Sequence, residues 1–237
     1  MTPIQQLMLG VGASKKTYLD DVFHIQVHAG NSATRSINNG INLSSSGGLI
    51  WAKTRDVANS NHTLFDTVRG ATKYLSSSTT SAEATYTGNG ITSFNNNGYT
   101  LGDDSSWQGL NHSGNKYVLN TFRKAPGFFD VVTFTKTTSG AQTINHNLGS
   151  VPGLILLKNT SNSHNWFVYH RETKGTNFLY LNTTDASAAS YAVWNNTTPT
   201  ATNFQISESF TNGHTFVAYL FAGGESTAAT ARSVDFT

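Results

Sequence analysis

Hydrophobic and polar residues alternate along some short stretches of the chain, while other short stretches are apolar throughout. Alternation occurs in "FHIQVHA" from Phe23 and "FVYHRE" from Phe167, a pattern typical of strands with one buried face. Continuous apolar runs are "GLIWA" from Gly48, "GLILL" from Gly153 and "FVAYLFA" from Phe216, and they predict strands that are covered on both sides. Since no segment sustains an i, i+3, i+4, i+7 apolar pattern, we expect an all-β fold.

Turn signals separate these stretches along the whole chain. The clusters "INNG", "SSSGG", "TGNG", "NNNG", "NHSG" and "TNGH" are rich in Asn and Gly, which tolerate the positive φ angles of tight turns. The sequence therefore predicts many short strands joined by tight turns.

Three blocks of the first half of the chain reappear in the second half in the same order. The segment from Phe23 matches that from Phe129, and "INNGINLSSSGGLIWAK" (37–53) matches "INHNLGSVPGLILLK" (144–158). Near the end of each half, "SGNKYVLNTF" (113–122) matches "NGHTFVAYLF" (212–221).

Three weaker matches lie between these blocks. We align "LFDTVRG" from Leu64 with "WFVYHRE" from Trp166, "KYLSSSTTSA" from Lys73 with "LYLNTTDASA" from Leu179, and "ITSFNNNGYTLG" from Ile91 with "ATNFQISESF" from Ala201. Strand–turn patterns of β proteins can match by chance, but the preserved order of six blocks favours a duplication with loop insertions. A period of about 100 residues is the size of one small sandwich domain.

The predicted architecture is two tandem, duplicated β-sandwich units of jelly-roll-like character with a short N-terminal arm. The connection between them is placed at "RKAPG" (123–127), where Pro126 cannot donate a ladder hydrogen bond. The expected units are an N-terminal attachment arm, the first sandwich, the second sandwich and a C-terminal tail, at residues 1–20, 21–127, 128–223 and 224–237.

Composition and charge exclude several classes of function. Charged residues are 12% of the chain and the net charge is +2, whereas nucleic-acid binders gather Lys and Arg on one face. No apolar run reaches the length of a membrane span, and the N-terminal apolar patch lacks the basic residues that precede it in a secretory signal. We therefore expect neither nucleic-acid binding nor membrane insertion, and synthesis in a cytoplasm.

Signals for catalysis, metals or cofactors are weak. The chain has no Cys, and its 13 carboxylates are scattered, so no catalytic pair stands out. The histidines lack a second ligand at metal-binding spacing. We expect no enzyme activity, no cofactor and no metal.

Aromatic residues in polar loops are the candidates for binding. Trp107 and Trp194 precede the last strand of each half, and Tyr99 and Tyr191 lie nearby. Exposed aromatic faces can pack on the apolar side of sugar rings while neighbouring Asn, Asp and Gln bond the hydroxyls. The alternative is that each Trp closes the end of its own sandwich core or is buried in a subunit contact.

Several long blocks carry a resemblance to a known family. The blocks "GLIWAKTRD", "LFDTVRGATKYL", "FRKAPGFFDVVTFT" and "TINHNLGSVPGLILLK" resemble tail-fibre-like virion structural proteins of marine tailed bacteriophages, such as cyanophages. The similarity extends from about Lys15 to Ala222. It implies a virion structural protein that is fibre-like or tail-associated, whose partners are other virion proteins and host cell-surface polysaccharide.

Two classes of function remain open under this resemblance. One is an adhesin that contacts host glycan, and the other is a purely structural protein, such as a decoration protein of the capsid head. A polysaccharide-degrading tail enzyme is a more distant alternative. The resemblance also implies a homo-oligomer, with a trimer expected, located in the virion.

The N-terminus is a candidate assembly contact. Ile4, Leu7, Met8 and Leu9 lie in an uncharged segment, and apolar side chains favour burial at about 25 cal/mol per Å². We expect this segment to dock onto a partner chain or a neighbouring copy.

Overall fold

The structure is a computed structural model that describes residues 17–104, 109–189 and 191–223. Strands account for 44% of the chain and helix for 2%, which confirms the all-β prediction. The elements of the first half are η1 (Leu19–Asp21), β1 (Phe23–Ala29), β2 (Arg35–Asn38), β3 (Gly48–Thr54), β4 (Thr63–Asp66), β5 (Lys73–Ser76), β6 (Ala84–Thr85), β7 (Ile91–Asn95), β8 (Gly98–Leu101) and β9 (Lys116–Arg123).

The second half continues after a short connection. Its elements are β10 (Phe129–Thr135), β11 (Gln142–Asn145), β12 (Pro152–Asn159), β13 (Phe167–His170), β14 (Asn177–Tyr180), β15 (Ala188–Ala189), α2 (Tyr191–Trp194), β16 (Asn203–Ile206) and β17 (Thr215–Ala222). Within the described residues, no helix is long and apolar enough to cross a membrane.

The large sheets of the two halves have the same strand order. It is β1-β9-β3-β4-β5-β6 in the first half and β10-β17-β12-β13-β14-β15 in the second. The apolar runs that begin at Gly48 and Gly153 lie on β3 and β12, which take the same place in their sheets. This agreement is what a duplicated unit requires.

A smaller sheet covers one face of each large sheet. Strands β2, β8 and β7 form it in the first half, and β11 and β16 form it in the second. The two halves differ here, since the first half places the β7 strand before its partner β8, while the second half places the short helix α2 before β16.

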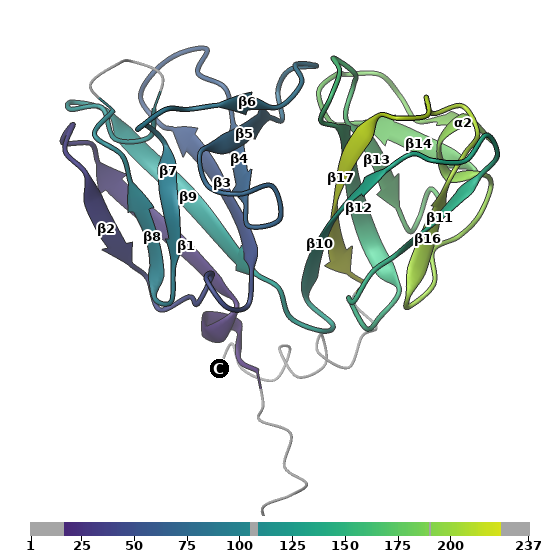
Figure 1. The fold of residues 1–237 in the computed structure, drawn as a ribbon, viewed down its shortest axis with the longest axis horizontal. Helices are drawn as coiled ribbons and strands as arrows, with labels where there is room; N and C mark the ends of the chain where they lie inside the picture. The colour runs from purple at the N-terminus through teal and green to yellow at the C-terminus, as the bar shows by residue number, and fades with distance from the viewer. Residues whose placement is uncertain (1–16, 105–108, 190, 224–237) are drawn as a thin grey trace, which may run out of the picture.

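The two large sheets also pack against each other, so the molecule is a stack of four sheets (Figure 1). Three layers of apolar side chains separate the sheets. The first core contains Ile41, Leu43, Ile50, Ala52, Phe65, Ile91, Tyr99, Leu101, Leu110, Tyr117 and Leu119. The central core, between the large sheets, contains Leu49, Leu64, Leu75, Phe129, Val131, Leu156, Trp166, Val168, Val217 and Tyr219. The second core includes Ile155, Leu157, Tyr169, Phe178, Val193, Trp194, Phe204, Ile206, Phe216, Ala218 and Leu220.

Packing on both faces explains the continuous apolar runs. On β3, Leu49 points into the central core, whereas Ile50 and Ala52 point into the first core. On β12, Leu156 faces the central core and Ile155 faces the second core. Because each fully buried aliphatic side chain contributes about 1.5–3 kcal/mol, both faces of these strands favour apolar residues.

The strand registers correct part of the sequence alignment. Leu49 pairs with Asp66 on β4, and the equivalent Leu154 pairs with His170 on β13. Asp66 therefore corresponds to His170, which shifts our alignment of the block from Leu64 by two residues. The block from Lys73 is shifted by two residues in the opposite direction, since its counterpart is Asn177 and not Leu179.

The block from Ile91 was also aligned wrongly. Tyr99 on β8 pairs with Ile37, and Phe204 on β16 pairs with Ile144. The equivalent strands are thus β8 and β16, not β7 and β16. The outer blocks, in which Phe122 corresponds to Phe221, were aligned correctly, because Leu49 and Leu154 pair with these two residues.

The central packing covers the two large sheets unequally. In the second half, Val131, Val217, Leu156 and Lys158 are buried between the sheets. Their first-half counterparts by strand register are Ile25, Val118, Trp51 and Lys53, and each of these is partly or largely exposed. We call this first-half set, together with the neighbouring Val27, the open strip.

Candidate functional site

Two of the four aromatic residues predicted to bind carbohydrate lie in the cores. Trp194 is 1% exposed and Tyr99 is 0% exposed. The Trp194 ring packs edge-on against Tyr169 at 5.9 Å between ring centroids. The prediction of an open stacking face is therefore wrong for these two rings, and the alternative that the Trp closes its own sandwich core is confirmed for Trp194. Tyr99 lies in the first core.

The remaining predicted contacts cannot be placed. Trp107 and the side chain of Tyr191 lie outside the described residues, as do the assembly candidates Ile4, Leu7, Met8 and Leu9.

A different aromatic cluster forms a pocket in the second half. We call it the aromatic pocket; its volume is about 240 Å³, and its lining residues are Asn159, His164, Phe167, Phe178, Tyr180, Val193, Ser209, Phe210, Thr211, His214 and Phe216. It opens at one end of the second sandwich, where β12 ends and β13 and β17 begin.

The walls of the aromatic pocket hold each other by edge-to-face contacts. Phe167 is central, with ring-centroid distances of 5.7 Å to Phe178, 5.5 Å to Tyr180 and 5.5 Å to Phe210. Phe210 also packs at 86° against Phe216. Aromatic rings favour such tilted and T-shaped pairs, so the walls are ordered before any ligand binds.

A hydrogen-bond network fixes His214 at the rim of the pocket. The Asn159 side-chain oxygen accepts from the backbone N–H groups of Ser161 and Asn162. That orientation directs the Asn159 Nδ2 group at His214 Nδ1, 3.0 Å away. His214 therefore accepts at Nδ1. On its other side, Nε2 lies 3.0 Å from the side-chain nitrogen of Asn162.

His164 stands beside His214 at the same rim. Their ring centroids are 6.3 Å apart. Partial burial, with the charge of Lys158 and the neighbouring His214 adding to it, lowers the pKa of His164. The ring is therefore neutral at pH 7 and can both donate and accept a hydrogen bond.

The first half has a pocket at the equivalent place, which we call the polar pocket. Its volume is about 370 Å³, and it is lined by Thr54, Asn59, Ser60, Asn61, Thr63, Tyr74, Ser76, Tyr86, Gly109 and Leu110. The strand registers match Thr63 with Phe167, Tyr74 with Phe178 and Ser76 with Tyr180. Two of the three aromatic walls are therefore replaced by hydroxyl side chains.

The polar pocket also contains a stacked ring of its own. Tyr86 lies on Tyr74 with 4.0 Å between ring centroids and an interplanar angle of 10°. The ring contacts of Phe178, the counterpart of Tyr74, are with Phe167 and Tyr180 at 73° and 66°. Within the described residues, no ring is stacked on Phe178.

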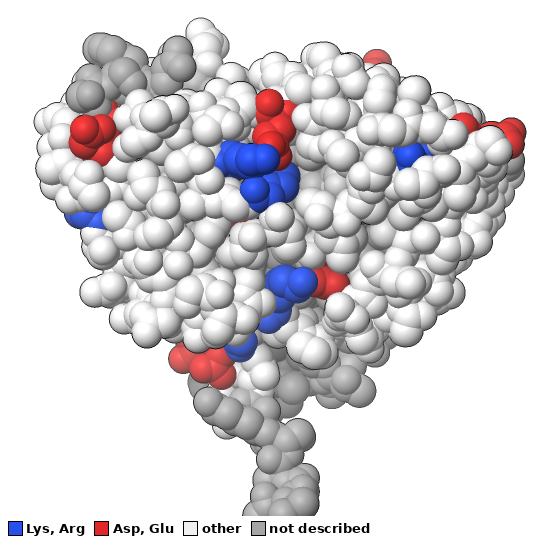
Figure 2. Space-filling model, in the orientation of Figure 1, with Lys and Arg blue, Asp and Glu red and all other residues white. Residues whose placement is uncertain are grey.

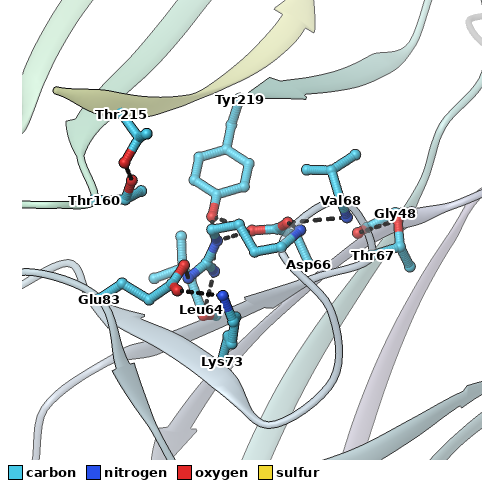
Figure 3. A network of polar contacts seen from close by, with 11 residues as sticks. Gly48, Leu64, Asp66, Thr67, Val68, Lys73, Glu83, Thr160, Thr215 and Tyr219 are labelled. Carbon is cyan, nitrogen blue, oxygen red and sulfur yellow. Dashed lines mark hydrogen bonds and ion pairs between the residues drawn. The ribbon is translucent and has the colours of Figure 1, made fainter. Parts of the chain in front are cut away.

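A buried polar cluster joins the two halves near the central core (Figure 3). Asp66 accepts hydrogen bonds from Tyr219 of the second half at 2.7 Å and from Arg69 Nε at 2.5 Å. Arg69 also contacts Glu83, which pairs with Lys73 at 2.9 Å. We call these five residues the interface clamp.

The clamp shifts the protonation of its members. Burial alone would lower the pKa of Arg69, but the Tyr219 hydroxyl and the Asp66 carboxylate together raise it above the ordinary value. Burial raises the pKa of Tyr219 as well. At its buried end, the clamp thus consists of the Asp66–Arg69 ion pair and the neutral Tyr219 hydroxyl, which secure the two halves at neutral pH.

Charge is otherwise sparse. Most of the face shown in Figure 2 is uncharged, with small mixed groups of basic and acidic side chains. Among the described residues, no group of three or more His, Asp or Glu side chains could hold a metal ion.

Comparison with known proteins identifies the family. Residues 20–229 match the model of a domain of unknown function, DUF7483, so the chain belongs to this family. The matched segment includes both sandwiches. No curated protein and no solved structure matches the chain.

The sequence reading missed the aromatic pocket. Phe210 stands in the polar loop "SESFTNGH", where it has the same kind of setting as the two Trp residues that we selected. The replacement of Thr63 by Phe167 at equivalent positions indicates that the second pocket is more aromatic. The sequence alignment did not pair these two residues, so this difference could not be seen.

Proposed function

We propose that the protein is a structural subunit of a bacteriophage particle, fibre-like or tail-associated, which assembles with further copies of itself and contacts the host surface. The resemblance of its long sequence blocks to virion proteins of marine tailed phages supports the setting. The observation that carries the structural role is the open strip.

In the second half, the surface equivalent to the open strip is covered by the first sandwich of the same chain. In the second half, the first half packs over Val131, which is 0% exposed. The equivalent Ile25 is 55% exposed, and the neighbouring Val27 is 54% exposed. Large apolar side chains grouped on one sheet face mark an interaction surface.

A second copy of the chain is the occupant that this comparison favours. The contact between the halves uses the same sheet face of each unit but is displaced from exact two-fold symmetry. Leu64 and its counterpart Val168 both lie in the central core, whereas Val131 is buried there and its counterpart Ile25 is exposed. A head-to-tail contact, in which the strip of one chain meets a different surface of the next chain, builds a closed ring when the rotation between chains closes. A ring of three chains would pair each open strip with a neighbouring copy, in agreement with the trimer that the resemblance implies.

The test combines sizing of the purified protein with a charged substitution on the strip. Light scattering should show an oligomer, and Val27→Glu should dissociate it with the melting temperature of the subunit unchanged. Val151→Glu is the matched control, because Val151 is 48% exposed outside the strip. A wild-type protein that stays monomeric would contradict the assembly role.

Location in the particle separates the two structural alternatives. Antibody labelling of purified phage particles should mark the tail or its fibres. Labelling of the head surface would favour a capsid decoration protein instead. Absence of the protein from purified particles would overturn the proposal.

A contact with host glycan is supported by a separate observation, the aromatic pocket. It combines apolar walls with a polar rim at one end of the second sandwich, as small-ligand sites do.

A further inference from the structure

We infer that the aromatic pocket binds a single neutral sugar ring, with the apolar face of the ring against the aromatic walls and its hydroxyl groups at the rim. This inference deepens the proposed function and rests on it for the host setting. It assigns the contact to Phe167, Phe178, Tyr180 and Phe210 in place of the predicted Trp residues.

The size of the pocket limits the ligand. Sites for drug-sized molecules have volumes of about 300–1,000 Å³, and this pocket has about 240 Å³. It therefore suits one ring of a glycan chain and leaves neighbouring sugars outside.

The lining separates apolar and polar groups. Five aromatic residues and Val193 form the walls, whereas His164, His214, Asn159, Ser209 and Thr211 contribute polar groups. A pyranose has the same division, because C–H groups cover one face and hydroxyls surround its edge. A purely apolar ligand would leave the His164 ring and the Ser209 hydroxyl without partners, which is unfavourable once water is displaced.

Hydrogen-bonding capacity remains at the pocket. Among the described residues, no hydrogen bond is formed by the His164 ring, the Tyr180 hydroxyl or the Ser209 hydroxyl. His164 is neutral at pH 7 and can both donate and accept. These groups match the mixed donor and acceptor character of sugar hydroxyls.

The charges around the pocket indicate a neutral sugar. Among the residues that the structure describes, no Asp, Glu, Lys or Arg lines it. Acidic sugars are usually held by Arg or Lys, which pair with carboxylates. Without such a residue, burying a charged sugar would be unfavourable.

The first half provides an internal model for the occupied state. There, the Tyr86 ring lies flat on Tyr74 at 4.0 Å. The counterpart of Tyr74 is Phe178, whose ring contacts within the described residues are tilted and not stacked. A bound sugar ring would lie on Phe178 as Tyr86 lies on Tyr74.

The experiment uses the full-length purified protein and four probes, the methyl glycosides of glucose, galactose, mannose and N-acetylglucosamine. Titrations are followed by heteronuclear NMR. At least one probe should shift the resonances of Phe167, Phe178, Phe210 and His214, with saturation. Ser209→Phe, which fills an exposed position of the lining, should weaken this probe at least tenfold.

Two further variants make the result specific. Asn61→Phe at the polar pocket is the matched control and should leave the affinity unchanged. His164→Ala removes a rim group without touching the walls, and it should weaken binding severalfold with an unchanged melting temperature. Both variants alter exposed side chains, so the fold should tolerate them.

Three outcomes would overturn the inference. They are saturation by none of the four glycosides, shifts that map outside the aromatic pocket, and shifts that phenol produces but the glycosides do not. The last outcome would show that the pocket takes an aromatic side chain instead of a sugar. Because this experiment uses the purified protein, a failure to bind sugar would not change the result of labelling phage particles. Absence of the protein from particles would likewise not change the sugar titration.

Discussion

The turn after β4 and the turn after β13 occupy equivalent positions, yet one is buried and charged and the other is exposed. In the first half, Asp66 and Arg69 lie in the interface clamp with side chains that are 0% and 3% exposed. Their counterparts are His170, which is exposed, and Thr173, which is partly exposed. The local turn geometry is retained, because Asp66 accepts from the N–H two residues later and His170 Nδ1 does the same.

This difference shows that the surroundings, not the turn itself, determine where charge is buried. The first turn lies against Tyr219 of the other half, while the second turn lies at the surface. A two-fold symmetric packing of the halves would give both turns the same environment. The halves instead meet through the same sheet face with a displacement, since Leu64 and its counterpart Val168 both lie in the central core while Val131 is buried and its counterpart Ile25 is exposed. This displacement is also why the open strip is only partly covered within the chain.

The largest effect is expected from breaking the clamp on its buried side. Arg69→Met would leave the Asp66 carboxylate buried without its cation. Removing one partner of a buried ion pair costs about 3–5 kcal/mol, and the free energy of unfolding should fall by this amount. Denaturant unfolding of the purified protein measures it.

The equivalent position of the second half supplies the control. Thr173→Met removes one hydrogen bond, from Thr173 to the His170 carbonyl, and should lower the free energy of unfolding by about 0.5–1.5 kcal/mol. Similar losses at both positions would contradict the view that the clamp depends on the interface.

The main features of the fold could be read from the sequence because they depend on local patterns. The runs that begin at Gly48 and Gly153 are apolar at successive positions, and both faces of these strands are covered as predicted. The glycine-rich turns are also where the chain needs them, since Gly40 and Gly213 adopt φ angles of 84° and 81°.

The site could not be read in the same way because it depends on register. A shift of two residues keeps the alternation of a strand intact, so the pattern gave no warning that Leu64 matches Val168 and not Trp166. Burial was also invisible at this level. Trp194 stands beside "NNTTPT", which suggests a loop, but the helix α2 turns its ring into the second core.

A second comparison concerns two lysines, Lys53 and Lys158, at equivalent positions of β3 and β12. Lys53 bonds Ser60 within its own loop, whereas Lys158 is 0% exposed and donates to the carbonyls of Thr80 and Asn159. Burial lowers the pKa of Lys158 to about 8. This value predicts a pH dependence of stability.

Between about pH 8 and 10, the folded protein releases the Lys158 proton while the unfolded chain retains it. Because the unfolded state retains this proton, Lys158 makes the free energy of unfolding rise with pH, by at most about 1.4 kcal/mol per pH unit. Burial raises the pKa of tyrosines such as Tyr219, which lowers the free energy of unfolding as the pH approaches about 10, so the slope is measured by urea unfolding at pH 8, 8.5 and 9. Lys158→Met should remove the rise and Lys53→Met should not. An equal slope in the Lys158→Met protein would contradict the assignment.

The smallest effect is expected at the exposed end of the clamp. The Lys73 side chain is 47% exposed where it pairs with Glu83, and exposed ion pairs contribute about 0–1 kcal/mol. Lys73→Asn gives the first half the residue that the second half has at Asn177. It should lower the free energy of unfolding by less than about 1 kcal/mol.

The effect of salt on the free energy of unfolding should distinguish the exposed end of the clamp from its buried end. Exposed charges are screened over about 8–10 Å at 0.10–0.15 M ionic strength, and buried pairs are screened much less. The difference between the Lys73→Asn protein and the wild type should therefore shrink when unfolding is measured in high salt, while the loss in Arg69→Met should persist. If salt removed both losses, Arg69 would have to be accessible to solvent, and the distinction between a buried and an exposed turn would fail.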